Sequence, residues 1–167
     1  MTAEFAVAVH AMELLHHKGT VLSSETIAQN VCTHPARVRK VLSKLEKAGL
    51  VEGKNGQQGG YQIARPAPEI TLLDIFDAVC DALLKNAWRS GDMDCECMVA
   101  SGMADVMDGV YTAVEKTGRE TLAAMTLADV DCQLFGGSLA GGSLAGGSLA
   151  GGSLAGGSLA GGTAKNK

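Results

Sequence analysis

The chain has 167 residues and a formal net charge of −4, with 14 Lys and Arg residues against 18 Asp and Glu residues. The charge is uneven: residues 1–66 carry eight basic and five acidic side chains, a net of +3, whereas residues 67–135 carry four basic and thirteen acidic ones, a net of −9. No stretch reaches the roughly 18 uninterrupted apolar residues of a membrane span, and no basic residues precede the apolar N-terminus as they would in a signal peptide. We therefore expect a cytoplasmic protein without a membrane partner, in which only the first half contacts a polyanion.

A low-complexity tail begins near residue 133. Its main part is five copies of Gly-Gly-Ser-Leu-Ala over residues 136–160, and the tail holds 12 of the 22 glycines. One leucine in five residues cannot build a core, so we predict a disordered linker over residues 133–167. The five cysteines are expected to be free thiols, because disulfides are rare in the cytoplasm.

Three helices are predicted in the first 48 residues. Apolar residues at helical spacing predict the first helix over residues 2–18, and a glycine follows it. Ser23 and Ser24 offer an N-cap for a short second helix. The tight connection Cys32-Thr33-His34 then leads to Pro35, which suits the first position of a third helix.

The third helix has the clearest amphipathic pattern in the chain. Its apolar stripe is Val38, Val41, Leu42 and Leu45, at the spacing of one helix face. Its other face is polar and strongly basic, with Arg37, Arg39, Lys40, Ser43, Lys44 and Lys47. Gly49 supplies the C-terminal stop.

A hairpin with a glycine-rich tip is predicted next. Residues 50–52 and 61–64 are apolar enough for two short strands. The loop between them contains Lys54, Asn55, Gly56, Gln57, Gln58, Gly59 and Gly60. Glycine permits positive φ and close approach of the backbone to another molecule, so this tip suits contact with a nucleic-acid backbone.

The second half is predicted to be helical. Thr71 caps a fourth helix whose apolar residues continue to Leu84, and a loop covers residues 87–97. A long helix follows over residues 98–125, with a final short helical turn near residues 126–130. The long helix has an apolar stripe of Met103, Val106, Met107, Val110 and Val114, and we predict that this stripe is buried against a second copy of the chain.

Together these elements predict a mostly α fold with a small β-hairpin wing: a winged helix-turn-helix domain over residues 1–68, and dimerisation and sensor helices over residues 69–132. Such a fold places its second helix-turn-helix helix in the major groove of double-stranded DNA. The residues expected to read base edges are Ala36, Arg37, Arg39 and Lys40, and Lys44 and Lys47 are expected at phosphates, with Ser43 on the same DNA-facing side. The wing residues are expected at the phosphate backbone or in the minor groove: Lys54, Asn55, Gly56, Gln57, Gln58, Gly59 and Gly60.

The same residues carry a family resemblance. The stretch HPARVRKVLSKLEKAGLVEGKNGQQGGYQIARPAPEITLLDIFDAV resembles the DNA-binding core of the Rrf2 family of bacterial winged-helix regulators, and the likeness extends to the closing TLADV, near residue 132. The resemblance implies a homodimeric repressor or dual regulator of a near-palindromic site, with the long helix as the dimer contact. It also implies that Arg37, Arg39, Lys40 and the wing face DNA.

The cysteines leave the signal open. Several relatives are expected to hold an iron-sulfur cluster through three cysteines before the long helix, whereas this chain has only Cys95 and Cys97 there. We therefore predict no metal and no cofactor, and keep a cluster at this pair as an alternative. A thiol sensor at Cys32, Cys95 or Cys97 is another alternative, although Asp92, Asp94 and Glu96 are expected to raise the thiol pKa values of the pair. All five cysteines could instead be structural or incidental.

Two other classes of function compete with DNA binding. A winged helix can serve as a protein-interaction module, in which case the basic helix face is only a solvated surface. An enzyme is not expected, because the sequence assembles neither a nucleophile with its base nor a phosphate-binding loop.

Overall fold

The computed structural model describes residues 3–56, 59–84 and 91–136. It is mostly helical with one two-stranded antiparallel hairpin, which confirms the predicted fold class. The elements are α1 (Ala3–Lys18), α2 (Ser24–Val31), α3 (Pro35–Lys47), β1 (Val51–Lys54), β2 (Gly60–Ile63), the short 3-10 helix η1 (Ala67–Glu69), α4 (Leu72–Val79), α5 (Met98–Ala123) and α6 (Leu127–Phe135). Within the described residues, none of the helices is long and apolar enough to cross a membrane.

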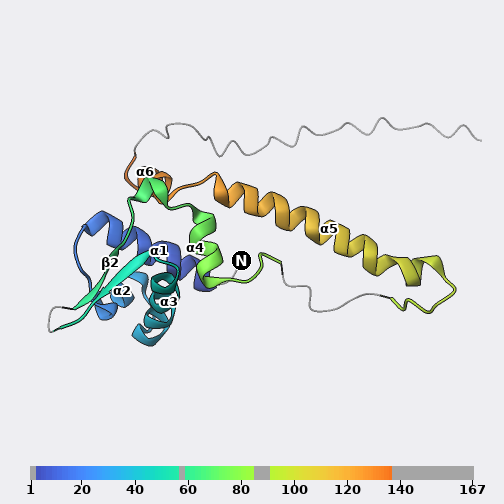
Figure 1. The fold of residues 1–167 in the computed structure, drawn as a ribbon, viewed down its shortest axis with the longest axis horizontal. Helices are drawn as coiled ribbons and strands as arrows, with labels where there is room; N and C mark the ends of the chain where they lie inside the picture. The colour runs from blue at the N-terminus through green and yellow to red at the C-terminus, as the bar shows by residue number, and fades with distance from the viewer. Residues whose placement is uncertain (1–2, 57–58, 85–90, 137–167) are drawn as a thin grey trace, which may run out of the picture.

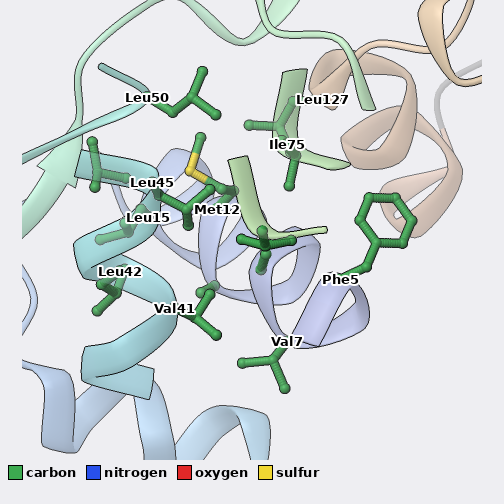
Figure 2. Packing of buried hydrophobic residues seen from close by; sticks show 14 of the residues in the cluster. Phe5, Val7, Met12, Leu15, Val41, Leu42, Leu45, Leu50, Ile75 and Leu127 are labelled. Atoms are coloured by element: carbon green, nitrogen blue, oxygen red, sulfur yellow. The ribbon is translucent and has the colours of Figure 1, made fainter. Parts of the chain in front are cut away.

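A hydrophobic core lies where α1, α3 and α4 meet (Figure 2). Met12 of α1, Leu42 of α3 and Phe76 of α4 are each fully buried, and the ring of Phe76 meets that of Phe5 edge-on with centroids 5.5 Å apart. Burial of a large apolar side chain stabilises a fold by about 1.5–3 kcal/mol. The third helix contributes the predicted stripe, since Val38, Val41, Leu42 and Leu45 are all buried.

The turn between α2 and α3 is built from local caps. The Ser23 hydroxyl accepts a hydrogen bond from the amide of Thr26 at the start of α2. Cys32 ends α2 in the left-handed conformation, with φ of 55°. The imidazole Nδ1 of His34 then accepts from the amide of Ala36 at 3.2 Å, which satisfies a free N–H in the first turn of α3. These caps set the direction in which α3 leaves the turn.

The wing is longer than the sequence predicts. Strand pairing extends to Lys54 opposite Gly60, two residues that were expected in the loop. Tyr61 also forms an antiparallel bridge with Leu22, through backbone hydrogen bonds of 2.8 and 3.0 Å. A Cβ at Gly60 would lie 2.3 Å from the carbonyl oxygen of Leu22, so this strand pairing requires glycine at position 60.

Helix α4 is shorter than predicted, because it ends at Val79 and not at Leu84. Cys80 is extended, with φ of −130° and ψ of 147°. The amides of Leu83 and Leu84 then bind the carboxylate of Glu115 on α5, at 3.0–3.2 Å. A tertiary acceptor thus replaces the helical carbonyls that these amides would need if α4 continued.

Helix α6 is longer than the short turn that the sequence predicts. Thr126 and Asp129 form a reciprocal capping box at its start, and the helix continues to Phe135. It packs on α1 and η1, and its Leu127 is fully buried in the core. The core therefore contains residues of α4 and α6 together with residues of the segment 1–68, which was expected to form a separate domain. Helix α6 also extends into the segment from residue 133 that was assigned to the tail.

Helix α5 was predicted nearly to the residue, and its C-terminal part packs on α4. Figure 1 shows the rest of α5 extending away from the bundle of α1 to α4. Its apolar stripe is open to solvent in the isolated chain: Met103 is 38% exposed, Val106 63%, Val110 47% and Val114 51%, while Met107 is half-buried.

Candidate nucleic-acid interface

The outer face of α3 presents a group of exposed side chains that we call the basic face: Ala36, Arg37, Arg39, Lys40, Ser43 and Lys47. The buried stripe faces the core, and helical periodicity therefore turns this group outward. The first turn of α3 follows directly from the turn at His34, so Arg37 and Arg39 lie at the end of the helix that winged-helix proteins insert into the major groove.

Acidic neighbours hold two cations of the basic face. Arg39 lies 3.2 Å from Glu25 of α2, and Lys40 lies 3.3 Å from Glu4 of α1. The backbone amide of Glu25 itself, then the Ser24 hydroxyl and Arg39, hold the pKa of Glu25 below its ordinary value. The Arg39 and Glu25 side chains are 57% and 59% exposed, so this contact contributes little stability and a phosphate or base can replace it.

Arg37 and Lys47 have no acidic partner within residues 3–56, 59–84 and 91–136. Both side chains belong to the exposed outer face of α3. Their positive charge is therefore available to an external anion without breaking an internal contact.

Lys44 departs from the expected placement. Its ammonium Nζ lies 2.6 Å from Oε2 of Glu4 and donates to the carbonyl oxygen of Val79 at 3.1 Å. The side chain is 35% exposed, whereas that of Lys40 is 68% exposed. Sequence periodicity assigned Lys44 to the DNA side, but the structure turns its charge toward α1 and the end of α4.

The wing lies beside this face. Lys54, Asn55 and Gly56 are exposed, Gly59 and Gly60 are half-buried, and Gln57 and Gln58 lie outside the described residues. Gly56 has φ of 120°, a backbone conformation that residues other than glycine rarely adopt. A Cβ at Gly59 would lie 2.4 Å from the carbonyl oxygen of Lys54, so the turn depends on glycine here as well.

Glu46 of α3 makes a contact with the wing that the sequence interpretation missed. Its Oε1 accepts a hydrogen bond from the amide of Gly53 at 3.2 Å and thereby joins the end of α3 to the wing. A Cβ at Gly53 would lie 2.6 Å from the same oxygen. The available signal was an acidic residue near the end of the basic helix, followed by a glycine within the strand.

The three candidate sensor cysteines occupy two separate places. Cys32 is exposed in the turn before α3. Cys95 and Cys97 are exposed in the loop before α5, and Cys97 is the N-cap residue of that helix. One candidate thiol therefore lies beside the recognition helix, and the other two lie beside the long helix.

The pKa expectation for Cys97 was wrong. The amide groups of Ala100 and then Val99 lower the pKa of the Cys97 thiol, although the nearby acids were expected to raise it. The free N–H groups of a helix's first turn stabilise a thiolate more directly than exposed carboxylates in a loop destabilise it. The expectation had considered only the charged side chains near Cys97 and not the dipoles of these backbone amides.

The donors for an iron-sulfur cluster are incomplete. Among residues 3–56, 59–84 and 91–136, no three His, Cys, Asp or Glu side chains gather at metal-binding distances. Cys95 and Cys97 are two thiols, whereas an iron-sulfur cluster as a whole generally has four protein ligands. The residues present therefore do not fit a cluster, and we assign no step to one.

Comparison with known proteins identifies the family. A profile of the Rrf2 family, described as iron-dependent transcriptional regulator, matches residues 1–132. The chain is 30% identical over 135 residues to the HTH-type transcriptional regulator YwnA of Bacillus subtilis strain 168, covering 81% of this chain and 99% of YwnA.

Two solved structures share the fold. A transcriptional regulator from Lactobacillus plantarum superposes with a TM-score of 0.70 at 26% identity, covering 80% of this chain and 91% of that one. T. potens IscR gives a TM-score of 0.62 at 26% identity, covering 85% and 93%. The chain thus belongs to the Rrf2 family of winged helix-turn-helix transcriptional regulators, which are DNA-binding proteins and not enzymes.

Proposed function

We propose that this protein is a homodimeric, sequence-specific DNA-binding repressor. The main support for this proposal is the basic face of α3. This helix is the second of a capped helix-turn-helix and lies beside a wing that depends on glycine. Ala36, Arg37, Arg39 and Lys40 reach base edges in the major groove. Ser43, Lys47 and the wing from Lys54 to Gly60 contact the phosphate backbone and fix the register.

The proposed dimer forms through α5. Val106, Val110 and Val114 are 63%, 47% and 51% exposed on a helix that extends away from its own core. A second copy related by two-fold symmetry would bury this stripe against the same stripe. Two recognition helices would then meet two half-sites of a near-palindromic operator. Repression would need no additional domain, because a dimer bound across a promoter blocks access of RNA polymerase to it.

The proposed signal is oxidation of the thiol at Cys97. It lies at the N-terminus of α5, and the amides of Ala100 and Val99 favour its thiolate. A peroxide would oxidise the Cys97 thiolate to a sulfenic acid, and the thiol of Cys95, two residues away, would displace water from it to form a disulfide. Oxidation of Cys97 would alter the first turn of α5, the proposed dimer helix.

The deciding experiment is DNA selection followed by a salt titration. The reduced full-length protein is incubated with fragments of its source genome, and the enriched duplex is used in fluorescence anisotropy from 50 to 300 mM salt, roughly the range in which counterion release is measurable. We expect one enriched near-palindromic sequence, bound by two copies of the chain with an affinity that falls steeply with salt.

The alternative is a protein-interaction module that uses the same winged helix. It predicts weak binding to all duplexes and no enriched sequence. That result would contradict the proposed function even if weak binding depended on salt, because any basic surface attracts DNA non-specifically. Treatment of the complex with diamide and then with dithiothreitol tests the signal separately, through loss and recovery of binding.

A further inference from the structure

We infer that Lys44 is a positioning residue, which holds the recognition helix to the end of α4, and is not a DNA ligand. This inference rests on the proposed function, because it assigns roles within the same DNA-reading helix. It also predicts a change in the backbone of α4 that can be measured without DNA.

Lys44 joins three elements at one point. Its ammonium group on α3 is 2.6 Å from the Glu4 carboxylate on α1 and 3.1 Å from the carbonyl oxygen of Val79, the last residue of α4. These groups line a hollow of about 390 Å³ between the first turn of α1 and the end of α4. The Lys44 side chain lies on the wall of this hollow and links α3 to both neighbours.

The charges at this point favour the contact. The hydrogen bond from Lys44 is the largest cause that lowers the pKa of the Glu4 carboxyl, so Glu4 is ionised at neutral pH. The Val79 carbonyl belongs to the last turn of α4, where carbonyl groups lack helical partners and carry partial negative charge. Lys44 thus satisfies two acceptors. Moving it to a phosphate would leave the Val79 carbonyl without a cation and Glu4 with Lys40 alone.

The contact also lies on a continuous path to α5. The segment 79–84 receives Lys44 at its first carbonyl, and the amides of Leu83 and Leu84 bind Glu115 of α5 at its other end. A displacement of α5 that moves Glu115 would therefore pull on the segment whose start holds α3. This gives the proposed signal at Cys97 a covalent and hydrogen-bonded route to the DNA-reading helix.

The sharpest test compares two acidic residues that pair with cations of α3: Glu25 with Arg39, and Glu4 with Lys40 and Lys44. Glu25→Gln releases Arg39 and removes a negative charge near DNA, so we expect tighter binding to the selected duplex. Glu4→Gln also removes a negative charge and releases Lys40, and both changes favour DNA binding, but it weakens the positioning contact of Lys44. We expect it to lower the affinity at least about threefold, although simple electrostatics predicts a gain.

A second comparison uses two lysines of the same helix. Lys47→Met removes an exposed cation and should reduce the slope of log affinity against log salt by about 1 for each phosphate that this cation neutralises, hence by about 2 in a dimer. Lys44→Met should lower the affinity about tenfold, because the loss of a hydrogen bond to a charged group loosens the attachment of α3, while leaving that slope unchanged. An equal reduction of the slope in the two variants would overturn the inference, and so would a rise in affinity in Glu4→Gln.

Hydrogen exchange measured by mass spectrometry gives the readout that needs no DNA. Peptides covering residues 76–84 should exchange faster in Lys44→Met and Glu4→Gln than in the wild type or in Lys47→Met. Unchanged exchange in both variants would refute the positioning role. If the wild type selected no DNA but this exchange difference appeared, the proposed function would fail while the contact of Lys44 with α4 stood.

Discussion

Glu13 of α1 and Asp131 of α6 bring two carboxyl groups together inside the interface between these helices. Glu13 is only 5% exposed, and neither of its carboxylate oxygens has a hydrogen-bond donor. Burial, and then the neighbouring Asp131, raise the pKa of Glu13 to about 7. Beyond the pair, His17 lies 3.8 Å from Asp131 and stacks on Phe135. Two carboxylates can only accept hydrogen bonds, so a proton on Glu13 supplies the missing donor.

This pair makes stability depend on pH. The pKa of Glu13 is higher in the folded state than its ordinary value of 4.5, so the folded state binds the proton more tightly. The free energy of unfolding should therefore fall as pH rises from about 4.5 to about 7, and the loss should be complete above that window. Glu13→Gln should remove the loss and be more stable than the wild type at pH 8, by on the order of 1–3 kcal/mol.

Urea unfolding at pH 5.5 and at pH 8, followed by circular dichroism, measures this difference. Asp131→Asn is the matched variant, because it removes the second carboxylate and should lower the pKa of Glu13. A wild type equally stable at both pH values would mean that Glu13 is already ionised within the interface.

Arg39→Ala should relax the choice of DNA sequence at one position of each half-site. The guanidinium is 3.2 Å from Glu25 in the free protein and must exchange this partner for a base edge. Loss of a base contact of this kind costs about 1–3 kcal/mol of discrimination. Competition assays with single-base variants of the selected duplex measure the effect. Affinity and discrimination both equal to the wild type would show that α3 is not the reading helix.

Gly60→Ala should destabilise the wing. The new Cβ would lie 2.3 Å from the carbonyl oxygen of Leu22, where two backbone hydrogen bonds hold Tyr61. Overpacking of this kind costs about 1–3 kcal/mol. Lys54→Ala, at the paired position on β1, should leave the thermal midpoint nearly unchanged while weakening DNA binding. Equal midpoints for Gly60→Ala and the wild type would mean that β2 can move away from Leu22 without loss of stability.

Val110→Asp should convert the dimer to a monomer. The side chain is 47% exposed in the isolated chain and lies in the middle of the apolar stripe of α5. A carboxylate buried between two copies would be desolvated and would repel its symmetry mate. Sedimentation velocity gives the mass, and Thr112→Asp, an exposed position off the stripe, is the control. A dimer that survives Val110→Asp but not Thr112→Asp would place the interface on another face of α5.

Cys97 should account for most of the fast reaction of this loop with iodoacetamide at pH 7.5. The amides of Ala100 and Val99 lower its pKa and raise the fraction of reactive thiolate. Cys97→Ser should therefore slow alkylation of the peptide containing residues 95–97 more than Cys95→Ser does. The opposite order, measured by mass spectrometry over time, would exclude Cys97 as the primary thiol of the proposed signal.

Several elements could be predicted because their signals are local in the sequence. Pro35, the stripe of α3 and the glycine after it defined the recognition helix, because helical periodicity and caps act within a few residues. The strand residues and glycines around the wing defined a hairpin for the same reason. The order of these motifs was also sufficient for the family, and the family comparison confirmed it.

Other features depend on contacts between residues that are distant in the sequence, and these could not be predicted. Periodicity turns Lys44 outward, but Glu4 and Val79, 40 and 35 residues away, draw its charge inward. The apolar pattern of α4 continues to Leu84, but Glu115 captures the amides that would extend the helix. Glu13 appears in the sequence as an ordinary acid that interrupts an apolar helix, and only the packing of α6 on α1 places Asp131 beside it. In each case a charge or hydrogen-bond acceptor distant in sequence competes with a local preference, and its position exists only once the chain has folded.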